Sequence, residues 1–515
     1  MSSISSTPIA AATTGYGLRE HRGMIAVTVM SATILTALDT TIANVALPHM
    51  QGSLSATQDQ MTWALTSYII AGAIMTPLTG WLADRFGRKP LFLFSVIGFT
   101  IASALCGMAQ SLPQVVAFRL LQGLCGASLF PMSQAVLFDI YPKAQAGRAM
   151  AIWGMGVGLG PMLGPVIGGW LTDNYSWRWV FFVNVPIGVL AVFGVLAYLP
   201  DTRHARKSFD FFGYAMLALF VGTLQMVLDR GPTKDWFDSA EIQLEAILAA
   251  LALYLFIVHT MTVDRPFIRF ALFKDRNYLS GNVMSFLMGM VMLAVMSLLA
   301  PFLQGLMHYS VLQSGYLMSS RSIGTMVSML VVGRMVGRID ARLLIATGLS
   351  LTAFSLWQMT QYNLSMDTWP IMLPGLIMGF GLGSAMVPAT TLAFATLVPA
   401  EFNEATALYA LIRNLGNSVG ISLMQGLLVH NMQTAHASLA AHITPYSRTL
   451  PHPAGATGIK AIELLNQQVT TQAALIAYID DFKFLMVAIL MALPLLLFVR
   501  SPGQIKQEVT TVVVE

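Results

Sequence analysis

The sequence predicts an all-α polytopic membrane protein, built from two related six-helix halves and an inserted helix pair. Three observations support this fold class. Hydrophobic residues make up 56% of the 515 positions and charged residues only 10%, whereas a soluble domain carries about 25% charged residues. Fourteen apolar runs are long enough to span a membrane, and a short basic motif occurs twice. We therefore expect one membrane domain with 14 transmembrane helices.

The apolar runs each have about 18 residues or more, the length that a spanning helix needs. They are 24–47, 62–82, 91–110, 113–138, 149–171, 179–200, 211–229, 243–262, 280–302, 313–333, 343–361, 370–396, 405–428 and 482–499. Most connections between them are short, but segment 429–481 is long, and loops over about 12–15 residues without a role are uncommon. Part of it, IKAIELLNQQVTTQAALIAYIDDF, has a helical pattern. We expect this segment to fold and to dock a partner.

The basic residues indicate the orientation of the chain. Most of its 28 lysines and arginines fall in the loops on one side of the predicted spans. Cytoplasmic loops carry such an excess. Segments 1–23 and 500–515 are therefore expected to be cytoplasmic tails, and segment 429–481 is expected to be periplasmic.

A motif and its faint copy define the two halves. Gly80–Leu91 reads GWLADRFGRKPL, and Gly333–Leu344 reads GRMVGRIDARLL. Internal repeats of this kind are typical of secondary transporters. Because the copies join helices 2 and 3 and helices 10 and 11, the halves are 24–200 and 280–499. Segment 201–279 then holds helices 7 and 8 as an inserted pair.

Two ionisable residues in the N-terminal half are candidates for proton coupling. Asp39 lies within helix 1 and Arg119 within helix 4, at similar depth in the outer half of the membrane. A charge in the membrane interior is costly and marks a functional hypothesis by default. Burial raises the pKa of a carboxyl group and a nearby arginine lowers it, which suits a group that takes up and releases protons. The alternative is a purely structural ion pair between Asp39 and Arg119.

Polar residues at other positions in the spans predict a substrate cavity. We expect it to be lined by Asp39, Asn44, Gln122, Arg413 and Asn417. Arg321 in helix 10 is a further buried cation, for which snorkelling to the outer interface is the alternative. Three fixed positive charges against one carboxylate favour neutral or anionic lipophiles over cations.

Helix 5 carries small residues at every fourth position, with two prolines beside them. Small residues at this spacing let two helices approach closely, and proline weakens the local hydrogen-bond ladder. The stripe is either a static packing seam or a hinge that slides as the halves rock, and we favour the hinge. The residues are Gly156, Gly160, Pro161, Gly164, Pro165 and Gly168.

The first copy of the motif also predicts a conformational latch on the cytoplasmic side. Positive-inside topology explains the basic residues, but it does not explain the acidic residue or the glycines. We expect an inter-helix charge network that holds one conformation closed. Its members are Gly80, Asp84, Arg85, Gly87, Arg88, Asp139 and Arg148.

Several stretches resemble the major facilitator superfamily, in particular its fourteen-helix drug:proton antiporters and, among these, the EmrB-type branch. The resemblance covers nearly the whole chain. It rests on LDTTIANVALP (38–48), GWLADRFGRK (80–89), RLLQGLCGA (119–127), GLGPMLGPVIGGWL (158–171), WRWVFFVNVPIG (177–188) and LDRGPTKDWFDS (228–239).

This resemblance implies a function, a location and partners. It implies the major facilitator fold and proton-driven export of lipophilic toxic compounds across the bacterial inner membrane, with the proton gradient in place of a cofactor. For the EmrB-type branch it also implies docking to a periplasmic adaptor and an outer-membrane channel. Within this resemblance, GLGPMLGPVIGGWL is similar to the antiporter motif of helix 5, and RLLQGLCGA is similar to the helix 4 motif that is associated with proton coupling.

Other functions fit the sequence less well. Proton-coupled transport of a specific metabolite is the closest alternative. An enzyme would need a nucleophile, a base or a metal cluster; the histidines lie in loops or near helix ends, and the sequence has no phosphate-binding loop with its lysine. A sensor subunit would not need buried ionisable residues in several helices. The scattered basic residues do not predict nucleic-acid binding, and two cysteines do not predict a metal site.

Overall fold

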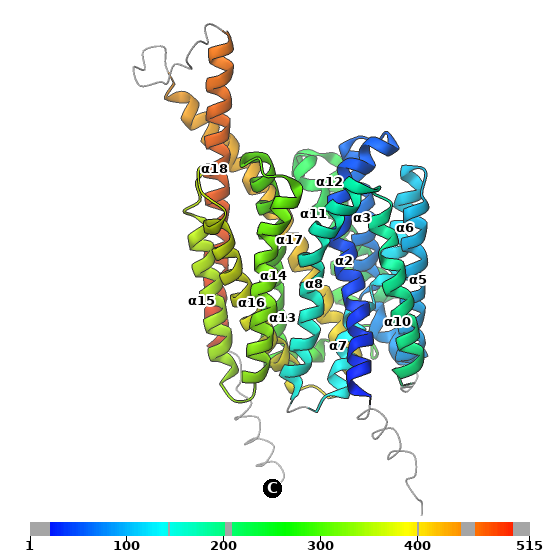
Figure 1. The fold of residues 1–515 in the computed structure, drawn as a ribbon. Helices are drawn as coiled ribbons and strands as arrows, with labels where there is room; N and C mark the ends of the chain where they lie inside the picture. Colours follow the sequence, from blue (N-terminus) through cyan, green and yellow to red (C-terminus); the bar gives the residue numbers. More distant parts are fainter. Residues whose placement is uncertain (1–20, 143–144, 201–208, 399–400, 444–458, 498–515) are drawn as a thin grey trace, which may run out of the picture.

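A computed structural model gives the fold of the protein and describes residues 21–142, 145–200, 209–398, 401–443 and 459–497. These residues form a bundle of roughly parallel helices (Figure 1), and no strand occurs among them. The predicted all-α fold class is therefore confirmed. The predicted tails 1–23 and 500–515 lie almost entirely outside the described residues.

Each predicted span coincides with one helix or with two successive helices. The N-terminal half contains α2 (Arg22–Leu54), α3 (Gln58–Met75), α4 (Leu78–Phe86), α5 (Arg88–Met108), α6 (Leu112–Gly126), α7 (Leu129–Ile140), α8 (Ala146–Asn174), α9 (Trp179–Phe182) and α10 (Asn184–Tyr198). The inserted pair is α11 (Phe211–Arg230) and α12 (Ala240–Thr262). The C-terminal half contains α13 (Arg276–Pro301), α14 (Val311–Met335), α15 (Ala341–Met359), α16 (Trp369–Ala395), α17 (Phe402–Ala441) and α18 (Ile459–Ala492).

Length and composition alone identify fewer spans than the sequence pattern does. Within the described ranges, nine helices are long and apolar enough to cross a membrane. The count is up to ten if the second predicted span, which bends by 56° between its two helices, is one span. Helices α14, α15, α17 and α18 fall outside this set, yet α14 and α15 pack against α16, and α17 and α18 pack against α13, within the same bundle. They therefore belong to the membrane domain by their place in the fold.

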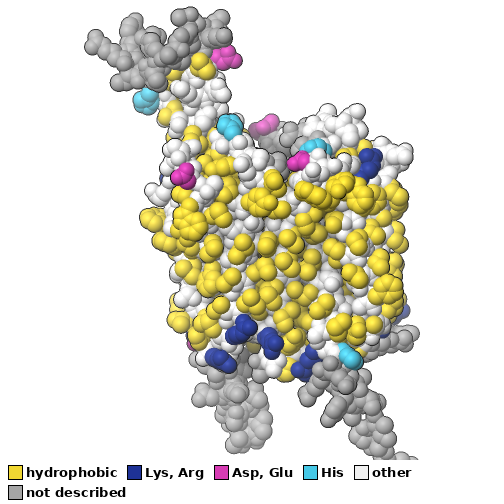
Figure 2. All heavy atoms as spheres, in the orientation of Figure 1, with side chains coloured by type: hydrophobic (Ala, Val, Ile, Leu, Met, Phe, Trp, Pro, Cys, Tyr) yellow, Lys and Arg dark blue, Asp and Glu magenta, His cyan; other side chains and the backbone are white. Residues whose placement is uncertain are grey.

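The surface of the bundle has the distribution that a bilayer requires. Figure 2 shows hydrophobic side chains around its middle, and lysines and arginines gathered at the end where α2 begins. Large apolar residues such as Phe94, Leu190 and Phe193 are more than 60% exposed. In lipid such side chains face acyl chains, so their exposure is favourable. The protein is a multi-pass membrane protein.

One pair of helices projects far beyond this apolar belt. The 40-residue helix α17 is about 60 Å long, twice the thickness of a hydrocarbon core. Helix α18 rises beside it (Figure 1). We call this end of the molecule the hairpin end, and the opposite end, which carries Asp84 and Arg88, the motif end. Segment 429–481 was expected to be a loop with one helical part; instead α17 continues to Ala441, and residues 444–458 lie outside the described residues.

The two halves meet along two different seams. In the first, α8 packs directly on α14, where glycines let other side chains approach: Met329 lies against Gly154, and Ala151 lies against Gly333. In the second, α17 packs along α4, near the motif end. The described residues show no extended packing between α17 and α3, and α11 contacts both of these helices.

Candidate functional site

A buried ion pair lies at the centre of the N-terminal half. Arg119 of α6 donates from Nη1 to Oδ2 of Asp39 on α2, at 2.6 Å. The two side chains are 1% and 0% exposed. The two helices bring together residues 80 positions apart in the sequence. The proximity that was considered for Asp39 and Arg119 is thus observed, and their role in proton coupling stays a prediction.

Further polar groups form hydrogen bonds with the remaining donors and acceptors of this pair. Gln122 and Asn184 both donate to Oδ1 of Asp39, at 2.8 and 2.9 Å. Arg119 donates from Nε to the carbonyl of Ala64 at 3.1 Å, and its guanidinium lies 4.3 Å from the ring centroid of Tyr68. A buried ion pair is tolerated only when its remaining donors and acceptors are occupied in this way.

The aspartate is the member of this cluster that can change its charge. Arginine keeps its proton in proteins, and the amides of Gln122 and Asn184 do not titrate. If Asp39 gains a proton, the charge of Arg119 loses its only carboxylate within hydrogen-bonding distance among the described residues. An uncompensated buried charge is strongly destabilising. Protonation therefore disfavours any conformation in which Arg119 stays buried.

The five residues predicted to line one cavity do not lie together. Asp39 and Gln122 are fully buried inside the N-terminal half, so neither faces an open cavity in this conformation. Asn44 is exposed and donates to the carbonyl of Thr40 on its own helix. The structure does not bring the five residues together in this conformation, because helix 1 and helix 4 turn Asp39 and Gln122 toward each other. Their role in lining a substrate cavity stays a prediction.

Arg413 reaches from the C-terminal half into the N-terminal half. Its guanidinium lies 5.2 Å from the ring centroid of Trp153 on α8 and 5.5 Å from that of Phe130 on α7. The part of the chain that the structure describes offers it no carboxylate. An arginine over two aromatic faces is stabilised by about 0.5–2 kcal/mol, and its N–H donors stay available. Asn417, one turn further along α17, is half-buried.

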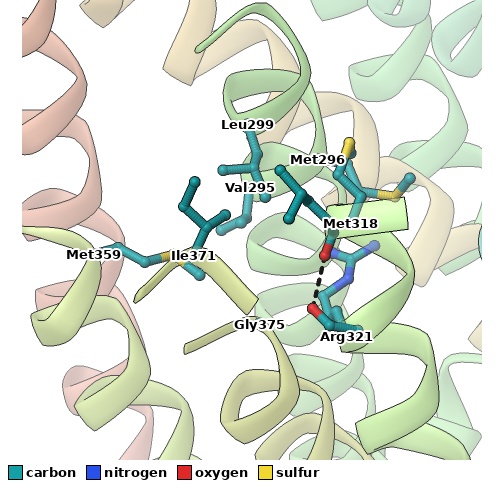
Figure 3. A pocket seen from close by; sticks show the side chains of 10 residues that line it. Val295, Met296, Leu299, Met318, Arg321, Met359, Ile371 and Gly375 are labelled. Atoms are coloured by element: carbon teal, nitrogen blue, oxygen red, sulfur yellow. Dashed lines mark hydrogen bonds between the residues drawn. The ribbon is translucent and has the colours of Figure 1, made fainter. Parts of the chain in front are cut away.

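Arg321 points into the C-terminal half and does not snorkel to the surface (Figure 3). It donates from Nη1 to the carbonyl of Met292 at 2.8 Å and is 8% exposed. It lines a small cavity together with Val295, Leu299 and Ile371, so mostly apolar side chains surround this cavity (Figure 3). No carboxylate within the described ranges pairs with it.

A second cavity, also reached by Arg321, lies between the two halves. Its volume is about 40 Å³, enough for a few water molecules but not for a drug-sized molecule. Its lining combines α8 with Met292, Met329 and Met386 from three helices of the C-terminal half. Methionine side chains adapt to differently shaped ligands, so this lining suits a cavity that enlarges when the halves separate.

The glycine stripe of α8 packs within its own half. A side chain at Gly160 would strike the backbone of Ala37, and one at Gly164 would strike Thr41, both on α2. Thr41 also donates to the carbonyl of Gly160 at 2.9 Å. The stripe is thus a close seam between α2 and α8, while Pro161 and Pro165 lie on the side toward the C-terminal half. Helix α8 is continuous across both prolines, and bending there stays a prediction.

The motif end holds a charge network that joins the halves. Arg88 forms an ion pair with Asp139 and donates from Nε to Oδ1 of Asn403 on α17 at 2.8 Å. Asn403 in turn donates to Asp84 at 2.6 Å. A side chain at Gly80 would strike the backbone of Asn403. Part of the predicted network is therefore observed, and it crosses between the halves at the motif end. Its role as a conformational latch stays a prediction.

Two residues of the predicted latch lie outside the network. Arg85 is exposed, with its guanidinium 6.0 Å from the ring of Trp81 on its own helix. Arg148 is also exposed, and no hydrogen bond described for the network involves it. Gly87 has φ = 93°, a conformation that glycine adopts readily, and it ends α4 so that α5 begins with Arg88.

Sequence reasoning missed several polar residues that the fold places at important positions. Asn184 and Asn403 complete the two networks, and Asn184 is recognisable as a polar residue within an apolar run. Asp229 at the end of α11 accepts a hydrogen bond from Thr66 of α3. Asp481 of α18 is 0% exposed and accepts a hydrogen bond from Asn431 at 3.1 Å. Asn403 carries no such signal, because it lies in a polar loop region of the sequence.

The comparisons with known proteins agree with this architecture. Residues 29–421 match the family model of the Major Facilitator Superfamily. The multidrug export protein EmrB of Escherichia coli strain K12 is 35% identical over 480 residues, which cover 92% of this chain and 94% of that protein. The fatty acid resistance protein FarB of Neisseria gonorrhoeae is 34% identical over 481 residues, with the same coverage.

A solved structure supports the fold independently of close sequence similarity. The crystal structure of the human organic anion transporter MFSD10 (TETRAN) aligns with a TM-score of 0.58, covering 91% of this chain and 99% of that chain at 15% identity. A likeness at this identity establishes the fold alone. Together with the family match and the relatives, it assigns the chain: this protein belongs to the Major Facilitator Superfamily, and within it to the group of the EmrB multidrug export proteins.

Proposed function

We propose that this protein is a proton-coupled antiporter that exports lipophilic compounds from the cytoplasm by alternating access. The observation that carries the proposal is the fully buried Asp39–Arg119 pair, in which one group can change charge and the other cannot. The names of the relatives, multidrug export and fatty acid resistance, point to the same activity. The energy source is the proton gradient, and no cofactor is required.

The orientation follows from charge. The basic residues at the motif end support a cytoplasmic location for that end, and we infer that both termini lie on the same side. Asp84, Arg88, Asp139 and Asn403 join the halves at the motif end, which supports a conformation that is closed to the cytoplasm. Release of a substrate to the outside and uptake of a proton by Asp39 belong to this half of the cycle.

The favoured substrates are neutral or anionic lipophiles. Arg321 and Arg413 lie at the cavity and the interface between the halves, and the described residues offer neither of them a carboxylate. Fixed positive charge in a low-dielectric cavity favours anions and disfavours cations. The name of the relative FarB refers to fatty acids, which are lipophilic anions.

The test of the export function is gradient-driven transport in inside-out vesicles. Acidifying the lumen should drive accumulation of a lipophilic reporter in vesicles that contain the wild-type protein, and a protonophore should abolish it. The matched control is vesicles with the Asp39→Asn variant at equal expression. Equal accumulation with and without the gradient would show that transport is not proton-driven.

The projecting hairpin of α17 and α18 is proposed to dock a periplasmic adaptor protein, which would connect the pump to an outer-membrane channel. The hairpin extends from the membrane domain by several helical turns (Figure 1). Deleting its outer part should reduce drug resistance of whole cells and leave vesicle transport unchanged. Loss of vesicle transport would instead make the hairpin part of the pump itself.

A further inference from the structure

Helix α11 of the inserted pair contacts α3 of the N-terminal half and α17 of the C-terminal half, and the described residues show no extended packing between these two helices. Helix α11 is attached to α3 at both ends: the Tyr214 hydroxyl donates to the carbonyl of Ile74 at 3.3 Å near the motif end, and Thr66 donates to Asp229 near the hairpin end. Arg230 lies 5.3 Å from the ring centroid of Trp63, also on α3. Helix α11 and α3 therefore form one unit at the edge of the N-terminal half.

The loop after α11 extends from this unit to the C-terminal half. Trp236 inserts its indole ring between Gly231 of the same loop and Gly426 of α17. A Cβ atom added at Gly426 would lie 3.4 Å from the indole Nε1, so the gap between the ring and α17 has room for about one methyl group and not for a larger side chain. Gly426 is 24 residues beyond the start of α17, about 36 Å toward the hairpin end.

The loop backbone that holds the ring in this position has an unfavourable conformation. Asp235 and Trp236 both have positive φ values, 55° and 53°, and side chains other than glycine rarely adopt this region. Backbone strain of this kind persists where the surrounding structure imposes it, and it concentrates at clamps and switch regions. The loop is also fixed from the other side, because Arg230 pairs with Glu241 and Glu245 at the start of α12.

From these contacts we propose that Trp236 is a positioning residue, a spacer that keeps α17 away from α3 at the hairpin end. The inference rests on alternating access as proposed above, since it concerns which conformation the protein favours. The contact is between an aromatic ring and a glycine, with no ion pair across it, so the spacer acts by its volume. Closing the hairpin end then requires the ring to leave the gap between Gly231 and Gly426.

A spacer and a tether predict different results when the contact is changed from its two sides. Removing the ring in Trp236→Ala lets α17 approach α3, which favours closure of the hairpin end. Adding bulk in Gly426→Leu widens the gap, which favours opening. A tether would be broken by either change, and both variants would then shift the protein in the same direction.

The experiment measures access to the interior from the hairpin side. A cysteine replaces Met386, which lines the cavity between the halves, in a background without Cys106 and Cys125. Its labelling by a membrane-impermeant maleimide is followed in right-side-out vesicles. We expect several-fold slower labelling in Trp236→Ala, faster labelling in Gly426→Leu, and a smaller decrease in Trp236→Phe, which keeps much of the volume.

Phe237→Ala is the matched control, because Phe237 is the next residue in the loop and is 61% exposed. It should label at the wild-type rate. Wild-type labelling in Trp236→Ala, or shifts of the same sign in Trp236→Ala and Gly426→Leu, would overturn the proposal. The labelling needs no transport, so its result is separate from the vesicle assay: absence of gradient-driven export by the wild type would refute the proposed function and leave the spacer test intact.

Discussion

The buried arginines of the two halves have different partners. In the N-terminal half, Arg119 lies 2.6 Å from the carboxylate of Asp39, and the pair is neutral. In the C-terminal half, Arg321 is held by a backbone carbonyl and Arg413 by two aromatic rings. The first arrangement can respond to a proton, whereas the arginines of the second keep their charge at physiological pH.

This difference suggests a division of labour between halves that share an internal repeat. In the proposed mechanism, the titratable pair enclosed in one half would couple the proton, and the fixed charges that face the interface and its cavity would select the substrate. Arg413 also contacts Trp153 and Phe130 across the interface, so its surroundings change whenever the halves move apart. The following changes test this division, from the largest expected effect to the smallest.

Asp39→Asn should have the largest effect. The amide keeps a similar shape but cannot take up or release a proton, so gradient-driven transport in vesicles should be lost. Breaking a buried pair also leaves Arg119 uncompensated, which costs about 3–5 kcal/mol of stability. The double variant Asp39→Asn/Arg119→Gln removes both charges; its melting temperature should recover toward the wild type while transport stays absent. Normal pumping by Asp39→Asn would make Asp39 a structural residue.

Arg119 should tolerate one substitution better than another. Arg119→Lys keeps a positive charge near Asp39 but loses the planar group that also donates to Ala64 and Gln122. Transport should therefore fall in Arg119→Lys and fall further in Arg119→Ala, in which Asp39 has no cation. Initial rates against the size of the pH gradient will separate the two variants. Wild-type rates in both would remove Arg119 from the coupling mechanism.

Arg413→Gln should change selectivity more than rate. Removing this charge eliminates the attraction of anions and the repulsion of cations at the interface. A change of about 1 kcal/mol in the difference between their binding free energies corresponds to roughly a fivefold change in relative affinity. Competition against one reporter substrate should show weaker inhibition by lipophilic anions and stronger inhibition by matched cations. Arg413→Lys is the control that keeps the charge. An unchanged order of inhibitors in Arg413→Gln would exclude Arg413 as a determinant of substrate charge.

Part of this arrangement could be predicted from the sequence, because it depends on local sequence patterns. Asp39 and Arg119 are recognisable because a charged residue within an apolar run is rare, and the spans are recognisable because each is continuous in the sequence. The partners across the fold were not accessible: Asn403 lies in a polar segment, and nothing local shows that it meets Asp84 and Arg88. The sequence also does not show which neighbouring helix a given helix face contacts. The glycine stripe of α8 therefore fits either a hinge or a packing seam, and only the fold shows its contact with α2.

Arg321→Gln should have the smallest effect of the series. Its guanidinium is bound to the carbonyl of Met292 and lies beside a cavity that holds only a few water molecules, so an anion reaches it only after the halves separate. A glutamine amide can still donate to this carbonyl, which limits the loss of stability to about 1 kcal/mol. The selectivity between anions and cations should shift in the same direction as in Arg413→Gln, but less. Both variants and their combination, measured with one set of competing substrates, decide whether the two charges act on the same ligand. Additive shifts in selectivity indicate separate contributions. A larger shift in Arg321→Gln than in Arg413→Gln would place the anion site within the C-terminal half instead of at the interface.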